Sequence, residues 1–350
     1  MRWAQQRATR RVTIKAMASV QIPGVERPYV WQEAWGELPA PVDPLAWAHP
    51  GLAAAPNGEL LIVDAAQPVV HILDAAGVLQ RSIDLPVAEG HGITLERVDG
   101  VATLWVADPG FKLRARGPER ETEGPGTGRV LQMDRTGQVL LEIGVPPHAA
   151  YREAAFKPTG MCFSGPPGDR TLWIADGYGA SLVHRYRTDG TYLGTIAGGD
   201  DDALRFQTPH GVFVDDRGPE SELLVTDRIG RRLQAFDLDG TFRHTIAEGE
   251  LTSPSALARL GDLLIVAELR ASLAVLDPDG RVIGRIGDRA DRADEQDWPN
   301  ARDEIGNLVR SPRIASGGFH GPHGLAVGVD GSITVAEFVL GGRLVHLAPA

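Results

Sequence analysis

Short apolar segments recur along this chain, and residues that favour turns separate them. Six of these segments, each four or five residues long, are followed directly by an acidic residue, namely Asp64, Asp108, Asp176, Asp227, Glu268 and Glu337. Apolar runs this short, bounded by Gly, Pro, Asn and Asp, are typical of buried β-strands, because a helix needs ten or more residues to bury one face. The pattern therefore predicts a protein built mainly from short strands.

The segments belong to a longer repeat. Each copy opens with Pro, His or Gly before a first apolar strand, and the segment that ends in an acid follows. Two further strands then meet at a tight turn such as Asp239-Gly240. The six openings lie at 49–52, 90–93, 158–161, 209–212, 254–257 and 322–325. Four antiparallel strands per copy are typical of a propeller blade, so the sequence predicts an all-β fold, a six-bladed β-propeller.

The two ends of the chain are expected to meet in the last blade. The sixth copy stops after 343–347, one strand short, whereas an additional strand lies at 29–36 ahead of the first copy. When this N-terminal strand completes the last blade, the ring closes and no strand edge stays exposed. We therefore expect a single propeller domain over 29–350, preceded by a basic and poorly ordered leader over 1–28.

Composition narrows the choice of partners and of compartment. The chain has 35 basic and 46 acidic residues, a formal charge of −11, which gives no electrostatic attraction for nucleic acid. It contains no run of about 18 apolar residues, so we expect no contact with a membrane through a spanning segment. Cys162 is the only cysteine, which excludes an intrachain disulfide and favours a reducing, cytoplasmic location. The sequence carries no signal for the oligomeric state.

Histidine occupies the blade-opening position in every second blade. In blade order, that position holds Pro50, His91, Thr159, His210, Ser255 and His323. Alternate blades of a six-bladed ring are about 120° apart, so three inward-pointing imidazoles can meet one ion at the roughly 2.0–2.1 Å expected for zinc and leave a fourth position open. In the alternative interpretation, each ring merely packs against the neighbouring blade. The register favours the first interpretation, a site for Zn²⁺ or another divalent metal formed by His91, His210 and His323.

Two further residues are candidates for chemistry at the same rim. Tyr178 follows the second strand of blade three, and Arg228 stands at the matching place in blade four. A phenol has a pKa near 10, but a nearby Zn²⁺ stabilises the phenolate and makes it a usable base. A guanidinium is suited to binding a carboxylate. The structural alternatives are a tyrosine packed in a β-bulge and a salt bridge between Arg228 and Asp227.

The remaining chemistry-bearing features are the recurring acids and two insertions. Because an acid ends the second strand of every blade, we expect it to accept backbone N–H bonds there, although the longer Glu268 and Glu337 can alternatively reach the axis. The insertions, at 112–128 and 288–321, both fall on the histidine rim. Loops of this length in a compact fold are usually functional or disordered, so we expect them to form lids or walls of a site.

The repeat resembles the NHL family of propeller blades over about 29–347. The match is close in blade four, where 206–215, Thr226-Asp227-Arg228 and 234–240 follow the pattern of one such blade. A blade type names a scaffold and leaves the function open.

The rim residues, taken together, resemble those of peptidyl-α-hydroxyglycine α-amidating lyase, a six-bladed enzyme that splits a carbinolamide into an amide and glyoxylate. The motifs are His91-Gly92, Asp176-Gly177-Tyr178, Pro209-His210, Asp227-Arg228 and Pro322-His323. The resemblance implies that His91, His210 and His323 bind zinc, that Tyr178 is the base, and that Arg228 binds the substrate carboxylate.

This chain also departs from that family. It has Asp64-Ala65-Ala66 where the family carries a second catalytic arginine, Gly179 in place of a disulfide cysteine, and Gly324 in place of an aspartate that helps to bind structural Ca²⁺. The lyase scaffold is therefore better supported than a peptide substrate or a calcium site.

The sequence thus favours a metal-dependent lyase that cleaves a carbon–heteroatom bond at a hydroxylated carbon of a small or peptide-like substrate. Two alternatives stay open: a zinc-dependent hydrolase similar to lactonase propellers, and a non-catalytic NHL binding scaffold.

Overall fold

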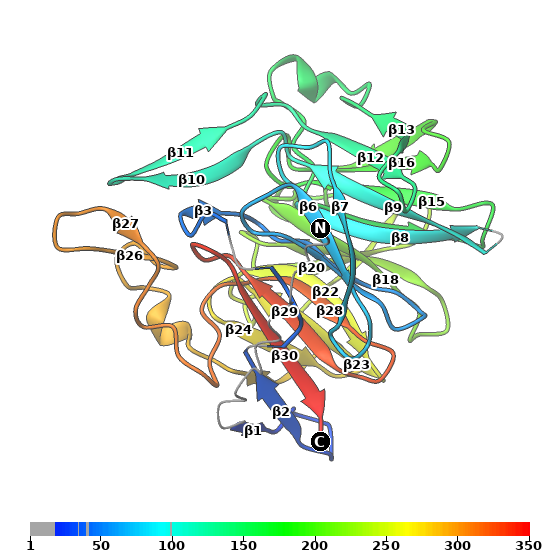
Figure 1. Cartoon of the computed structure of the whole chain (residues 1–350). Helices are drawn as coiled ribbons and strands as arrows, with labels where there is room; N and C mark the ends of the chain where they lie inside the picture. Colours follow the sequence, from blue (N-terminus) through cyan, green and yellow to red (C-terminus); the bar gives the residue numbers. More distant parts are fainter. Residues whose placement is uncertain (1–17, 34, 40–41, 99) are drawn as a thin grey trace, which may run out of the picture.

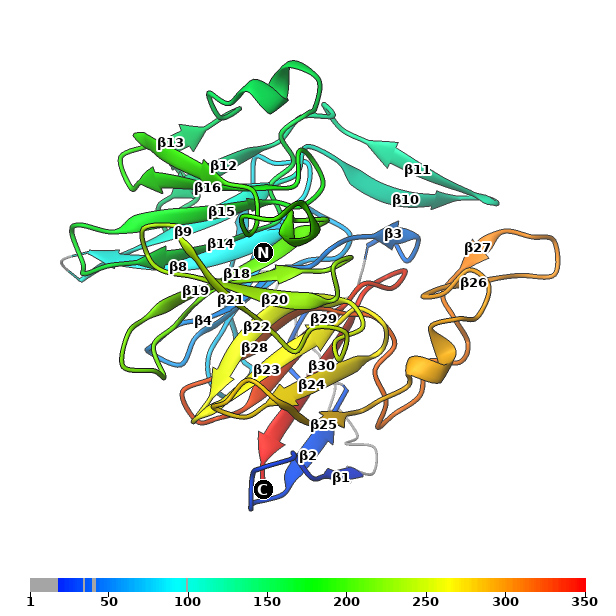
Figure 2. The same ribbon diagram turned by 180° about the vertical axis from the view of Figure 1, so that it is seen from behind.

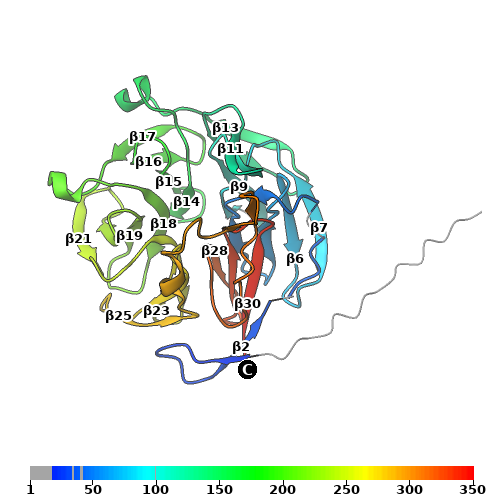
Figure 3. The same cartoon turned by 90° about the vertical axis from the view of Figure 1, so that its left-hand side faces the viewer.

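The described part of the chain consists of short antiparallel sheets arranged around one axis (Figures 1 and 3). The structure is a computed structural model and describes residues 18–33, 35–39, 42–98 and 100–350. Blades one to three are β4 (Leu52–Ala54), β5 (Leu60–Val63), β6 (Val69–Leu73) and β7 (Leu79–Asp84); β8 (Gly92–Val98), β9 (Val101–Asp108), β12 (Arg129–Met133) and β13 (Val139–Ile143); and β14 (Gly160–Ser164), β15 (Thr171–Asp176), β16 (Leu182–Arg187) and β17 (Tyr192–Ile196).

The other blades follow the same order. Blades four and five are β18 (Pro209–Asp215), β19 (Glu222–Asp227), β20 (Arg232–Phe236) and β21 (Phe242–Ile246); and β22 (Pro254–Leu260), β23 (Leu263–Glu268), β24 (Ser272–Leu276) and β25 (Val282–Ile286). The sixth sheet is β28 (Pro322–Val327), β29 (Ile333–Glu337), β30 (Arg343–Pro349), β2 (Tyr29–Gln32) and β1 (Ala18–Val20). Each first strand contacts that of the next blade, and β28 contacts β4. The predicted all-β propeller fold is confirmed.

Both ends of the described chain lie in the sixth sheet. β2 is antiparallel to β30, with Tyr29 opposite Pro349 and Trp31 opposite Leu347. Of the predicted leader, 1–17 lies outside the described residues, whereas β1 pairs with β2. The sheet therefore extends further toward the N-terminus than the expected boundary at residue 29, and the domain assignment stays a prediction. Within the described residues, no helix is long and apolar enough to cross a membrane. The cytoplasmic location also stays a prediction.

The core lies between the blades, where apolar side chains of neighbouring sheets meet. Blades two and three share a cluster that contains Trp105 and Ile174, and blades five and six share one that contains Trp31, Ile265 and Val335. Each of these five side chains is at most 2% exposed. Second strands are buried on both faces, which explains why they appear in the sequence as continuous apolar runs.

Glycine allows the first strands to approach closely at the axis. A Cβ atom on Gly51 would lie 2.8 Å from the carbonyl oxygen of His91, and one on Gly160 would lie 2.7 Å from that of His210. Any larger residue would push these strands apart, and this accounts for the glycine that follows the blade-opening position.

The recurring acids have the structural role expected of them. Asp227 accepts hydrogen bonds from the backbone N–H groups of Gln207 (2.8 Å) and Thr208 (3.1 Å), and so ties the link before blade four to the end of β19. Glu268 and Glu337 are fully buried and pair with Arg285 (2.8 Å) and Arg343 (2.6 Å). The alternative in which these two glutamates reach the axis is therefore wrong.

The two insertions lie on one face of the propeller (Figures 1 and 2). The first forms a hairpin of β10 (Lys112–Arg116) and β11 (Glu119–Glu123), and β10 also pairs with β3 (Ala46–Trp47). The second contains β26 (Ala301–Arg302), β27 (Leu308–Val309) and the 3₁₀ turn η3 (Ala290–Arg292). Two more 3₁₀ turns, η1 (Ala149–Arg152) and η2 (Asp202–Leu204), precede blades three and four.

Candidate functional site

Three histidines from alternate blades meet at the axis. His91 precedes β8, while His210 and His323 lie at the start of β18 and β28. Their ring centroids are 4.9 Å (His91–His210), 4.7 Å (His91–His323) and 4.9 Å (His210–His323) apart, a nearly equilateral triangle. One nitrogen from each ring lies within 4.8 Å of the other two. The blade register thus brings together the three residues that the sequence singled out.

Backbone carbonyls of the intervening blades orient two of the rings. His91 Nδ1 lies 2.7 Å from the Thr159 carbonyl oxygen, and His210 Nδ1 lies 2.8 Å from that of Ser255. A carbonyl only accepts, so Nδ1 carries the proton in each ring and Nε2 keeps its lone pair. This is the arrangement by which proteins fix the tautomer of a histidine that binds a metal.

His323 is held differently. It is 3% exposed, and neither of its ring nitrogens has a hydrogen-bond partner in the described part of the chain. Buried polar atoms are normally paired, so two orphaned nitrogens facing two other imidazoles suggest that something else satisfies them. A metal ion would satisfy one of these two nitrogens, because it accepts one lone pair from each ring.

The electrostatic environment keeps all three rings neutral. Burial lowers the pKa of His91, His210 and His323 well below the usual value for histidine. The neighbouring imidazoles and the Arg228 guanidinium lower it further, because each additional positive charge would be repelled. Neutral imidazole is the form that coordinates metals.

Tyr178 and Arg228 both lie against the histidines. The Tyr178 hydroxyl is 3.3 Å from His91 Nε2 and 3.1 Å from His210 Nε2, and the Arg228 guanidinium donates to it at 3.3 Å. Burial raises the pKa of Tyr178, while the charge and hydrogen bond of Arg228 lower it. The suggested salt bridge between Arg228 and Asp227 is absent from the described structure, where Asp227 instead pairs with Arg232 at 3.2 Å.

A fourth histidine and an acid beside it lie next to these residues, although the repeat pattern did not predict them. His49 lies 5.0 Å from His91, 5.1 Å from His323 and 5.4 Å from Tyr178, measured between ring centroids. Its Nδ1 is 2.8 Å from Glu89 Oε1, and its ring stacks on Phe338 at 4.3 Å. The only sequence signal was the position of His49 directly before Pro50, the residue at the blade-opening position of blade one.

The two insertions contact each other above the histidine rim. The backbone N–H of Leu308 donates to the Gly117 carbonyl at 2.8 Å, and Arg302 donates to the Pro118 carbonyl at 3.0 Å. Leu308 also shares an apolar cluster with Trp47 and Phe338. The insertions thus wall this face of the site, in the position expected from the sequence.

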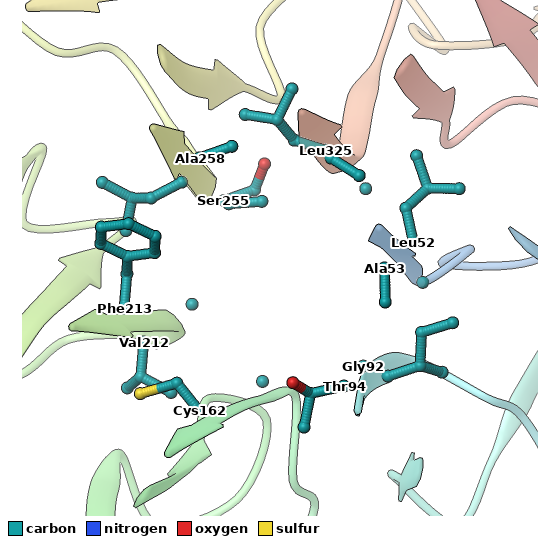
Figure 4. Close-up of a pocket in the computed structure, with 18 of the residues that line it drawn as sticks. Leu52, Ala53, Gly92, Thr94, Cys162, Val212, Phe213, Ser255, Ala258 and Leu325 are labelled. Atoms are coloured by element: carbon teal, nitrogen blue, oxygen red, sulfur yellow. The ribbon is translucent and has the colours of Figure 1, made fainter. Parts of the chain in front are cut away.

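A channel leads to the histidines between the first strands. It has a volume of about 430 Å³, and His91, His210 and His323 are among the residues that line it. Figure 4 shows Thr94, Cys162, Phe213, Ala258 and Leu325 among the residues around its open centre. The fold and the site together define a β-propeller with a buried group of three histidines that could hold a metal ion.

Solved structures with this fold include two lyases. The chain aligns over 92% of its length with 98% of a streptogramin B lyase, at a TM-score of 0.55 and 14% identity. It aligns over 92% of its length with 100% of virginiamycin B lyase from Staphylococcus aureus, at a TM-score of 0.54 and 13% identity. At such identities the likeness concerns the fold alone. No protein-family model and no curated protein matches the chain.

Proposed function

We propose that this protein is a metal-dependent lyase that cleaves a carbon–heteroatom bond at a hydroxylated carbon of a small or peptide-like substrate. The observation that carries the proposal is the position of the Tyr178 hydroxyl, within 3.3 Å of two histidine nitrogens and of the Arg228 guanidinium. A proton acceptor, a cation and two of the three neutral imidazoles converge there on one point.

His91, His210 and His323 would hold the metal, with zinc as the first choice, because neutral imidazoles and an open fourth position suit catalytic zinc. When bound, such an ion supplies Lewis acidity, which lowers the pKa of a hydroxyl group beside it. The lyase-type resemblance of the rim residues and the two lyases that share the fold agree with this choice of chemistry.

The residues of the chain have separate roles in the proposed reaction. Tyr178, as phenolate, takes the proton of the substrate hydroxyl, and the positive charge of Arg228 stabilises that phenolate. As the carbonyl forms, the carbon–heteroatom bond breaks and its electron pair leaves with the heteroatom, which takes up the proton that Tyr178 accepted. Arg228 also binds a substrate carboxylate through its remaining N–H groups. The walls formed by the insertions exclude bulk water.

The test is product trapping with zinc-loaded protein. A panel of N-acyl-α-hydroxyglycines is incubated with the protein, and glyoxylate is captured as a hydrazone. The proposal predicts glyoxylate and primary amide in equal amounts, whereas no carbonyl product from any panel member would contradict it. An Arg228→Met variant should raise KM for these acids more than for their carboxamide analogues.

A zinc-dependent hydrolase is the second candidate, because the same ligands can activate water. Ring opening of simple lactones without a carbonyl product would favour it. A protein that binds these compounds without turnover would favour the scaffold interpretation.

A further inference from the structure

The acid at the end of β15 differs from the matching acids of the other blades. In each of the other five blades, a basic side chain lies within 3.8 Å of the acid. The pairs are Asp64 with His71 (3.3 Å), Asp108 with Arg129 (3.8 Å), Asp227 with Arg232 (3.2 Å), Glu268 with Arg285 (2.8 Å) and Glu337 with Arg343 (2.6 Å). Asp176 is fully buried, and no basic side chain of the described residues lies this close to it. The exception therefore falls in the blade that carries Tyr178.

A phenol takes the place of the basic side chain. Tyr151, in the 3₁₀ turn η1 ahead of blade three, donates its hydroxyl hydrogen to Asp176 Oδ2 at 2.7 Å. The Tyr151 oxygen also lies 2.5 Å from His184 Nε2, and the other nitrogen of that ring, Nδ1, lies 2.7 Å from Thr195 Oγ1 on β17. A continuous chain of hydrogen bonds thus runs from the outer strand of blade three to the acid at the end of β15.

The direction of each hydrogen bond in this chain is fixed. An ionised carboxylate only accepts, so the single hydroxyl hydrogen of Tyr151 goes to Asp176. His184 Nε2 must then carry a proton and donate it to the phenol oxygen. Burial lowers the pKa of His184 to about 3, so the ring is neutral and its Nδ1 accepts from the Thr195 hydroxyl. Tyr151 is therefore held from both sides.

Asp176 in turn holds the turn that contains Tyr178. Its Oδ1 accepts from the backbone N–H of Lys157 at 2.7 Å, and its Oδ2 accepts from that of Ala180 at 2.6 Å. The turn lies tightly against this carboxylate, because a Cβ atom on Gly179 would collide with Asp176 Oδ1. Tyr178 lies between β15 and Ala180, so the place of its hydroxyl depends on where the carboxylate is held.

We infer that Tyr151 is a positioning residue: its hydroxyl fixes the Asp176 carboxylate and, through it, the turn that places Tyr178 against His91 and His210. This inference rests on the proposed function and adds a residue to it. Tyr151 belongs to the connection between β13 and β14 and not to the repeat. That connection therefore has a role at the site besides linking blades two and three.

The test is a double-mutant cycle on zinc-loaded protein, with glyoxylate release from N-acyl-α-hydroxyglycines as the readout. Tyr151→Phe removes the hydroxyl and keeps the ring. We expect kcat to fall roughly 10-fold, as for the loss of a hydrogen bond to a charged group, while KM stays near the wild-type value. In a Tyr178→Phe background, the same substitution should leave the residual kcat unchanged, because its effect passes through the Tyr178 hydroxyl.

Tyr186→Phe is the matched control. Tyr186 belongs to the apolar cluster against which Tyr151 packs, and loss of its hydroxyl should leave kcat near the starting value in both backgrounds. Zinc content shows that each variant is folded, because the three histidines meet only in the closed ring. An unchanged kcat in Tyr151→Phe, or an equal fall in both backgrounds, would overturn the inference. The second result would indicate a general loss of stability instead.

A crystal structure separates this inference from the proposed function. In Tyr151→Phe, the turn over 177–180 should be displaced or split between two conformers relative to the wild type in the same crystal form, and Tyr178 with it. A single, unmoved Tyr178 would refute the positioning role, whatever reaction the protein catalyses. Absence of glyoxylate from the wild type would count against the proposed function.

Discussion

The two sides of the histidine triangle are built differently. On one side, His91 and His210 each donate Nδ1–H to a backbone carbonyl, and both contact the Tyr178 hydroxyl. On the other side, His323 has no hydrogen-bond partner in the described structure and lies 5.1 Å from His49, measured between the rings. The first pair is fixed by the fold, whereas the third ring depends on what it binds.

This difference indicates how a propeller can build such a site. The carbonyls that hold the two rings come from Thr159 and Ser255, the blade-opening residues of blades three and five. Blades two and four therefore supply the two fixed rings, and the blades that follow them supply the carbonyls that orient these rings. His323 completes the set, and we expect its ring to become fully ordered only around an ion.

The largest effect is expected from loss of a ligand on the fixed side. His210→Ala should weaken zinc binding by more than about 100-fold, the upper end of the cost of removing a ligand's hydrogen-bond partner, and should abolish turnover. Competition with a chelator measures the affinity. His184→Gln, which alters a buried histidine of blade three, should keep zinc affinity near that of the wild type. Equal zinc affinity in His210→Ala and the wild type would refute the ligand assignment.

The next largest effect, on kcat, is expected at Tyr178, whose hydroxyl contacts both His91 and His210. Tyr178→Phe should keep the metal and lower kcat by about 10²–10⁴-fold, because the phenol oxygen is the proposed proton acceptor. Tyr192→Phe is the matched control. It removes a phenol hydroxyl from the outer strand of the same blade, where that hydroxyl lies 2.6 Å from Thr195 Oγ1, and it should leave kcat near the wild-type value. Unchanged turnover in Tyr178→Phe would remove this residue from the mechanism.

The third prediction concerns the stability of the sixth sheet, which carries His323. Trp31 in β2 is 2% exposed, packs on Phe319 at 4.7 Å and shares an apolar cluster with Val335 and Leu347, so it joins the N-terminal strand to the rest of the sixth sheet. Trp31→Ala should lower the free energy of unfolding by about 3–5 kcal/mol. Urea denaturation measures this loss, with Ile305→Ala, which shortens an apolar side chain that is 83% exposed, as the control. A loss below about 1 kcal/mol would show that β2 is dispensable for the sheet.

The smallest effect is a pH dependence in the same blade. His346 stacks on Trp35 at 3.9 Å, and burial lowers its pKa to about 4. The folded state therefore binds this proton less readily than the unfolded state, in which the pKa is near 6.5. The folded state therefore has its full stability above about pH 6.5. As the pH falls toward 4, the unfolded state binds the proton first, and the free energy of unfolding falls by up to about 3 kcal/mol. Urea melts of chelator-treated protein should show this loss, and His346→Gln should reduce it. The same slope in both proteins would contradict the assignment.

The fold and the meeting of the three histidines could be predicted because the repeat fixes the register. The glycine that follows His91 and His210 marks the same place in five of the six blades, and blade five has Ala256 there, so counting along the repeat locates the axis. His49 could not be found in this way, because it precedes the blade-opening position by one residue. Its place depends on a contact with Glu89, which lies 40 residues further along the chain.

The contact between the first insertion and blade one was beyond prediction for another reason. Lys112 belongs to that insertion, which follows no repeat, and its ammonium reaches the Ala65 carbonyl only because β10 pairs with β3. The sequence located the insertion on the correct rim, yet its hairpin and the contact with blade one depend on tertiary packing. Features that lie outside the repeat therefore had to come from the structure.

The most direct test of the central claim is a crystal structure of zinc-loaded protein with anomalous scattering recorded at the zinc edge. The account predicts one anomalous peak per chain at the axis, within about 2.0–2.1 Å of the Nε2 atoms of His91 and His210 and of one ring nitrogen of His323. The absence of a peak at the three histidines in excess zinc, or a peak coordinated by other residues, would contradict it.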